Sequence, residues 1–108
     1  VTIDIYMTYI KKNAVVSNLE PEIVKESVAT ALVNGNNLLG PVVGNFCMQL
    51  AIKKAKSVGI GMVVANNSNH FGIAAQYSMQ ALNEKMIGMS FTNTTPVVYP
   101  TGAKSRTL

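Results

Sequence analysis

One short stretch, Asn67-Ser68-Asn69-His70-Phe71-Gly72, contains the only histidine of the 108 residues. An imidazole exchanges a proton near neutral pH, which is what a general acid or base requires. The residue types also suit a hydrogen-bonded loop histidine with no chemical role, so composition alone leaves both interpretations open. A nucleophilic triad is not indicated, because no carboxylate has a recognisable orienting position beside His70.

Metal chemistry is not expected of this chain. Cys47 is its single cysteine, and one cysteine with one histidine does not provide the ligand spacing of a zinc site. Cys47 falls on the apolar face of a predicted helix, where a small hydrophobic core residue is the simplest interpretation.

The elements on either side of His70 follow a strand, loop, helix and strand pattern. Residues 60–65 (IGMVVA) are a short continuous apolar run, typical of a strand buried on both faces of a parallel sheet. A helical stripe follows over residues 72–85, and residues 86–91 (MIGMSF) form a second apolar run. These lengths predict a βαβ unit and hence an α/β fold.

The same pattern places two polar loops at one edge of the predicted sheet. Residues 67–71 and 92–96 (TNTTP) each follow the carboxyl end of a predicted strand, and neighbouring strands lie about 5 Å apart. Ligands of open α/β sheets bind at that edge. If the two predicted strands are neighbours, His70 and the 92–96 loop line one pocket.

The first half of the chain predicts a helix, a strand and a longer helix. Residues 3–12 carry apolar side chains at helical spacing. Residues 23–33 are rich in β-branched side chains and favour a strand, which the cluster Asn34-Gly35-Asn36-Asn37 should end in a turn. Gly40-Pro41 opens the longer helix, and Gly59 suits its C-terminus.

Composition argues against a nucleic-acid or membrane partner. The formal charge of +4 comes from scattered lysines and arginines, and Lys53, Lys54 and Lys56 fall in the last turns of the longer helix, where the dipole favours cations. No apolar run reaches membrane-spanning length. With 48% hydrophobic and 13% charged residues, much of the surface is expected to be buried, as in a piece of a longer cytoplasmic protein.

Three segments together resemble one enzyme family. They are ALVNGNNLLGPV at 31–42, AIKKAKSVGIGMVVANNSNHFGIAAQYS at 51–78 and MIGMSFTNTTPVVYPTGAK at 86–104, in an order and spacing that match along nearly the whole chain. The stretches NSNHFG and TNTTPVVYPTG are the specific part. The family is that of the malate/L-lactate dehydrogenases, which also includes ureidoglycolate and sulfolactate dehydrogenases.

The resemblance implies an oxidoreductase that uses NAD or NADP and interconverts a small 2-hydroxy acid, such as malate or lactate, with its 2-oxo acid. It also implies a homodimer and an α/β fold of the family's own type, different from the standard Rossmann domain. His70 falls on the family histidine that exchanges a proton with the substrate oxygen. Thr94 falls on a position that contacts the nicotinamide cofactor, and Asn93 beside it is a second candidate.

The chain also departs from the family. Asn34 stands where the family usually has Asp, and Leu38 stands where it has a second glycine. The resemblance covers only part of a family chain, so residues 1–108 are expected to form a single partial domain. Residues 1–21 would be the end of a helical segment and its connection, and residues 22–108 the start of the cofactor-binding α/β domain. Such a piece is expected to be inactive by itself, and the alternative is a truncated remnant that only dimerises or binds a partner.

Overall fold

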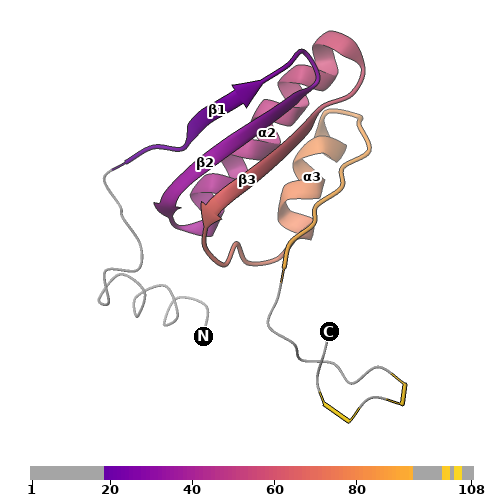
Figure 1. Ribbon diagram of the computed structural model, residues 1–108. Coiled ribbons are helices and arrows are strands. Elements are labelled where there is room, and N and C mark those ends of the chain that lie inside the picture. The colour runs from indigo at the N-terminus through magenta and orange to yellow at the C-terminus, as the bar shows by residue number, and fades with distance from the viewer. Residues whose placement is uncertain (1–18, 94–100, 103, 106–108) are drawn as a thin grey trace.

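The structure is a computed structural model that describes residues 19–93, 101, 102, 104 and 105. Its elements are β1 (Glu22–Glu26), β2 (Thr30–Leu38), α2 (Gly40–Val58), β3 (Met62–Ser68) and α3 (Ala75–Asn83) (Figure 1). The helix predicted over residues 3–12 lies outside the described residues.

The three strands form one mixed sheet in the order β1-β2-β3. Strand β1 pairs with β2 antiparallel, and β2 pairs with β3 parallel. Because α2 connects the two parallel strands, β2, α2 and β3 form a βαβ unit, with α3 packed beside α2 (Figure 1). The predicted α/β class is confirmed, although this βαβ unit lies one step earlier in the chain than the predicted one.

The predicted strand over residues 23–33 is in fact two strands joined by a turn. The Ser27 N–H donates to the Thr30 carbonyl over 2.8 Å. The Ser27 hydroxyl accepts from the Thr30 N–H at 3.1 Å and bonds to Thr30 Oγ1 at 2.6 Å. These hydroxyl bonds close the hairpin without the Gly, Pro or Asn that usually marks a turn. The irregular apolar spacing of this stretch therefore reflects two short strands.

The turn predicted at residues 34–37 is wrong, because β2 continues to Leu38. Asn36 and Asn37 do adopt positive φ angles of 52° and 58°, as the cluster was expected to allow. They interrupt the register of β2 with β3 between Asn34 and Leu38, and they do not reverse the chain. The asparagines thus permit an irregular strand end where β2 passes into α2.

Helix α2 has the start and the end that the sequence predicts. Proline lies in its first turn, and Gly59 follows its last residue in the left-handed conformation, with φ of 94°. The Gly59 N–H donates to the Ala55 carbonyl over 2.8 Å, which satisfies one of the terminal carbonyls of the helix. Of the described helices, neither is long and apolar enough to cross a membrane.

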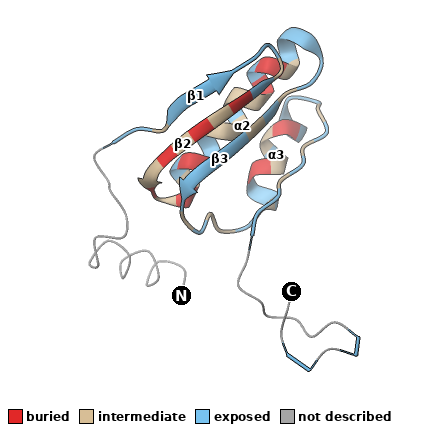
Figure 2. Ribbon diagram, viewed as in Figure 1, coloured by how far each residue is buried: buried red, intermediate tan, exposed pale blue. Residues whose placement is uncertain are grey.

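The core lies between the sheet and α2 and continues between α2 and α3 (Figure 2). Val33 of β2 and Val43 of α2 are 0% and 1% exposed, and Tyr77 of α3 is 2% exposed. Burial of each such side chain contributes about 1.5–3 kcal/mol. The other buried hydrophobic residues are Ala31, Leu38, Ile52 and Ala81.

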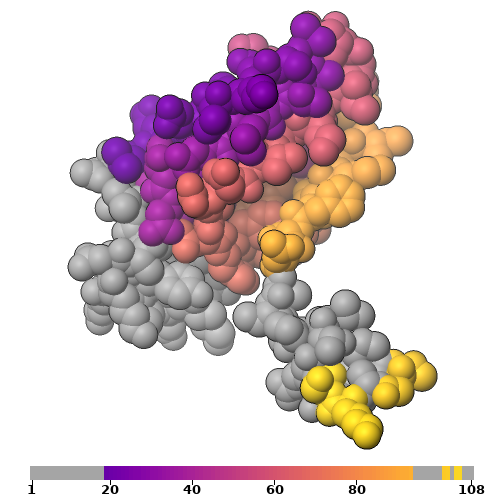
Figure 3. All heavy atoms as spheres, in the orientation of Figure 1, coloured from indigo at the N-terminus to yellow at the C-terminus, as the bar shows by residue number. Residues whose placement is uncertain are grey.

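Strand β3 lies in a parallel pair as predicted, but its partner is β2 instead of residues 86–91, and the prediction that both of its faces are buried is wrong. Met62 and Val64 remain 59% and 50% exposed. They pair with Thr30 and Leu32, which alternate with the buried residues of β2, so they lie on the face of the sheet away from α2. No described element covers this face, which Figure 3 shows as successive bands from β1, β2 and β3. We call the side of the sheet that carries Leu32, Met62 and Val64 the open face.

The second strand predicted over residues 86–91 is also wrong, since the described chain forms no strand there. The segment instead lies against α3 (Figure 1). A Cβ added at Gly88 would overlap the Ser78 carbonyl, and Ser90 Oγ lies 2.8 Å from Ser78 Oγ. The alternate side chains are exposed, and they are those of Ile87, Met89 and Phe91. The apolar residues that suggested a buried strand therefore point away from the helix.

A buried lysine, Lys54, ties the β1–β2 hairpin to α2. Its side chain is 8% exposed, and its Nζ donates to Glu26 Oε1 and to the Ser27 carbonyl, both over 2.7 Å. The hydrogen bond from Lys54 and its positive charge hold the pKa of Glu26 below its ordinary value of 4.5. Lys54 therefore holds the hairpin turn against α2. Its position near the helix C-terminus had indicated only a favourable interaction with the helix dipole.

We expect the substitution Lys54→Met to lower the melting temperature by several degrees at neutral pH, because the hairpin turn loses its bonds to α2. The folded-state pKa of Glu26 is lowered, so its contribution is present above pH 4.5 and is lost as the pH falls through the folded value. The gap between wild type and variant should therefore narrow in acid.

Thermal melts followed by circular dichroism at about pH 7 and about pH 3 measure this gap. Lys53→Met is the matched control, because exposed Lys53 makes the smallest contribution to the lowered pKa of Glu26 and should therefore give a smaller difference. An equal difference in melting temperature between wild type and Lys54→Met at both pH values would contradict the assigned role of the Lys54–Glu26 ion pair.

Candidate active site

His70 lies in the loop between β3 and α3, two residues past the last residue of the strand, and its side chain is exposed. The Gly72 N–H points at its Nδ1 over 3.3 Å. A nitrogen that accepts a hydrogen bond carries no proton, so this contact belongs to the neutral imidazole with its proton on Nε2. The loop therefore presents an accessible imidazole whose Nδ1 is turned toward its own backbone.

The residue before His70 holds the loop to the end of β2. Asn69 Nδ2 donates to the Leu38 carbonyl over 2.8 Å and contacts the Asn37 carbonyl and Oδ1 at 3.1 and 3.2 Å. Asn69 is half-buried. One amide group thus reaches from the His70 loop to the irregular strand end that the asparagine cluster creates.

The first residue of α2 lies directly against the His70 loop. A Cβ added at Gly40 would overlap the carbonyls of both Asn69 and His70, so the two backbones meet in a space that only glycine leaves open. The N-terminus of α2 has no side-chain cap. The His70 loop therefore packs against the junction between β2 and α2.

The residue after His70 is held from α3. The Tyr77 hydroxyl donates to the Phe71 carbonyl. The two rings are stacked, with centroids 4.7 Å apart and planes 23° from parallel. Tyr77 lies in the core against Gly44 of α2, where an added Cβ would overlap its ring. Both flanks of His70 are therefore fixed, one by β2 and one by α3.

Asparagine side chains join the ends of β2 and β3. Asn34 Oδ1 accepts from the Asn36 N–H over 2.9 Å and from Asn67 Nδ2 over 3.1 Å. Asn67 has a positive φ of 51°, which asparagine tolerates better than most residues. Asn34, which stands where an aspartate was expected, thus still provides an oxygen acceptor at this strand end.

Only one of the two cofactor candidates from the sequence lies among the described residues. Asn93 is exposed, and its carbonyl accepts from Thr92 Oγ1 over 3.4 Å. Thr94 lies outside the described residues. Because residues 86–91 form no strand beside β3, the pairing that was expected to place the 92–96 loop next to His70 is not found.

Cys47 is not activated as a nucleophile. It lies half-buried on α2, and burial raises the pKa of its thiol to about 11. The thiolate is the reactive form of cysteine, so Cys47 stays protonated near neutral pH. This supports its interpretation as a small hydrophobic residue.

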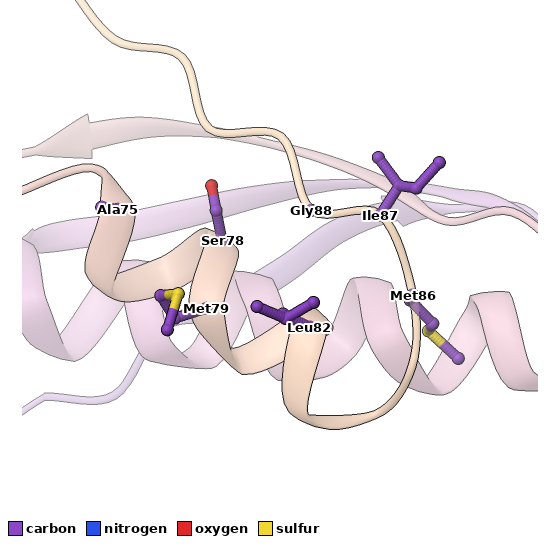
Figure 4. Close-up of a pocket in the computed structure, with 7 residues that line it drawn as sticks. All are labelled: Ala75, Ser78, Met79, Leu82, Met86, Ile87 and Gly88. Atoms are coloured by element: carbon purple, nitrogen blue, oxygen red, sulfur yellow. The ribbon is translucent and has the colours of Figure 1, made fainter.

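Among the hollows on the described surface are two that are lined by neither His70 nor Asn93. One lies between α3 and residues 86–88, and apart from Ser78 its lining side chains are apolar (Figure 4). The other lies beside Lys54 and Glu26. Neither of these two hollows therefore places a dinucleotide beside His70.

Comparison with known proteins decides the family. All of residues 1–108 match the sequence profile of a family described as malate/L-lactate dehydrogenase. The chain belongs to the malate/L-lactate dehydrogenase family. The L-sulfolactate dehydrogenase of Methanocaldococcus jannaschii is 50% identical over 103 residues, which are 95% of this chain and 30% of that protein. The ureidoglycolate dehydrogenase of Escherichia coli O157:H7 is 30% identical over 104 residues, 94% of this chain and 29% of that protein.

Solved structures of family members agree with the fold. The malate dehydrogenase of Pyrococcus horikoshii matches with a TM-score of 0.84 and 48% identity over 94% of this chain and 29% of that chain. The malate dehydrogenase of Entamoeba histolytica matches with a TM-score of 0.71 and 46% identity over 73% of this chain and 22% of that chain. The chain thus spans less than a third of the length of these family members.

The sequence singled out His70 but not the residues that hold it. Asn69 was visible only as a loop residue, since spacing does not reveal that its amide reaches β2. Gly40 was interpreted as a helix start and Tyr77 as part of an apolar stripe. The available signal for Tyr77 was its place six residues after Phe71, in the first turn and a half of the next helix.

We expect Gly40→Ala to displace the His70 loop, because the added methyl group overlaps backbone carbonyls that cannot rotate away. The expected cost is about 1–3 kcal/mol of folding free energy, as for other over-packed sites. Gly61→Ala is the matched control, since its methyl group would overlap the Ala51 carbonyl of α2 before the start of β3.

Both variants should be less stable in chemical denaturation. Only Gly40→Ala should shift the NMR resonances of the His70 imidazole. Unchanged His70 resonances in a folded Gly40→Ala protein would rule out the close approach described above.

Proposed function

We propose that the protein carrying this chain is an NAD(P)-dependent oxidoreductase that interconverts a 2-hydroxy acid, such as malate or lactate, with its 2-oxo acid. Membership of the malate/L-lactate dehydrogenase family supports this reaction class, as do the names of its malate, sulfolactate and ureidoglycolate dehydrogenase relatives. The observation that carries the proposal is His70, an exposed imidazole fixed on both flanks at the carboxyl end of β3.

His70 is the residue that exchanges a proton with the substrate oxygen in this proposal. In the described tautomer, Nε2–H can donate a hydrogen bond to the carbonyl oxygen of a 2-oxo acid. An imidazolium donates from both nitrogens, so protonated His70 must turn its Nδ1 away from the Gly72 N–H. In reduction the imidazolium would give its Nε2 proton to the substrate oxygen and become neutral with its remaining proton on Nδ1; in oxidation Nε2 would take the hydroxyl proton back. Both forms carry a proton on Nδ1, so the contact with the Gly72 N–H is open throughout this exchange.

The cofactor is assigned by family, and NAD and NADP both remain in the proposal. Thr94 and Asn93 are the proposed contacts to the nicotinamide, by their positions in the TNTTPVVYPTG stretch. The nicotinamide would accept or supply the hydride, and these two residues would hold it. Thermal-shift measurements with NADH and with NADPH distinguish the two, because a bound ligand raises the melting temperature.

We expect His70→Gln to reduce turnover of a 2-hydroxy acid by about 10²–10⁴-fold, the usual contribution of a positioned acid or base. The protein to assay is the one that its own gene encodes, with malate, lactate and sulfolactate as substrates. Because His70 is exposed, the variant should keep the wild-type melting temperature. Turnover close to wild type in a folded variant would show that another group transfers the proton.

We also propose that the protein is a homodimer. The exposed large apolar side chains of the open face and of the 86–91 segment support this, because exposed apolar surface commonly marks an interface. The same surface supports a second candidate function, a module without activity that only dimerises or binds a partner.

Light scattering after size exclusion tests the homodimer. We expect Val64→Asp, which places a charge on the open face, to convert dimer to monomer, whereas Lys53→Asp on an exposed part of α2 should not. A wild-type monomer, or a Val64→Asp dimer, would contradict the proposed interface. The second candidate is selected if dimers form while neither wild type nor His70→Gln shows turnover.

A further inference from the structure

We propose that Asn69 and Tyr77 are positioning residues that fix the His70 imidazole for proton transfer, an inference that rests on the proposed function. Each holds one of the two residues next to His70, and neither has been given a role by the family comparison. Both act through the backbone of the loop, so they set where the imidazole lies without contacting the substrate.

Asn69 fixes the loop on the side of the sheet. Its amide contacts three oxygens on two consecutive residues of β2, within 2.8–3.2 Å. Because Asn37 holds a positive φ of 58°, its carbonyl and Oδ1 both turn toward the same amide. A shorter or apolar side chain at position 69 cannot replace these contacts, so the loop would lose its anchor to β2.

Tyr77 fixes the loop on the side of the helices. Its hydroxyl bonds to the Phe71 carbonyl, while its ring stacks on Phe71 and occupies the space above Gly44. The ring is part of the core, with 2% of the residue exposed, so the hydroxyl has little freedom to move. A rigid core residue thus determines the position of the peptide that follows His70.

Two anchors are needed because His70 itself is exposed. The position of an exposed catalytic side chain depends strongly on the backbone that carries it. Proton transfer requires heavy atoms within about 2.6–3.2 Å, and displacement by about 1 Å can cost as much as 10²-fold in rate. Asn69 and Tyr77 therefore matter to turnover more than to the stability of the fold.

Tyr77→Phe is the sharper test, because it removes the hydroxyl and keeps the stacked ring. We expect kcat to fall by about 10-fold with KM unchanged, since the loop is misplaced while the substrate still binds. Ser78→Ala is the control, as it removes a neighbouring α3 hydroxyl bonded to Ser90. A Tyr77→Phe enzyme with wild-type kcat at a temperature where it is folded would overturn the role of Tyr77.

Asn69→Ala tests the other anchor, and we expect a similar loss of kcat. Asn45→Ala is its control, because Asn45 also uses its side-chain amide in one bond between elements, to Gln80 on α3. Equal loss of kcat in Asn69→Ala and Asn45→Ala would overturn a specific role for Asn69.

NMR separates this proposal from the proposed function. With ¹⁵N-labelled histidine, the His70 signals are identified by their absence from the His70→Gln spectrum. Tyr77→Phe and Asn69→Ala should shift or broaden these signals, and the two control variants should not. Unchanged His70 signals in both variants would overturn the positioning role. Changed signals in a protein whose turnover does not depend on His70 would uphold the positioning and refute the proposed function alone.

Discussion

The close approach of two backbones, at Gly40 and at residues 69–70, is the constraint on which the rest of the site depends. Parallel strands connected through a helix bring their carboxyl ends to one edge, and here that edge has no room for a side chain at the first residue of α2. Next to this approach, the Asn69 amide supplies a donor to the Asn37 and Leu38 carbonyls at the irregular end of β2. His70 is thus placed by the junction of β2 with α2 as much as by β3.

The sheet has one packed face and one open face, and this asymmetry explains several features together. Val33 and Ala31 pack on α2, whereas Met62 and Val64 on the other face remain exposed. A sheet with parallel strands normally has both faces covered. The exposed alternate residues of the 86–91 segment continue the same apolar character beside α3. The high hydrophobic fraction of the sequence is therefore only partly used in the described core.

What the sequence could predict depended on how local the determinants are. Helix α2 was predicted well, because Pro41 and Gly59 act through their own backbone preferences. The β1–β2 hairpin was missed, since its turn depends on the hydroxyl of Ser27 and on Lys54, a residue 27 positions away. The strand at residues 86–91 failed for the opposite reason, because an apolar run specifies a strand only when an edge accepts it. For the site, the residue with the distinctive chemistry was found and its anchors were not.

The two anchors of His70 belong to different parts of the fold, and this has a consequence for how the site responds to strain. Asn69 holds the loop to the end of β2, and Tyr77 holds it to α3. Any shift of α3 relative to the sheet must therefore stretch the loop between these two points, which includes His70. Because α3 packs on α2 rather than on the strands, Gly44 controls that shift by allowing the Tyr77 ring to lie flush against α2. The position of an exposed imidazole is thereby coupled to the packing of the buried core.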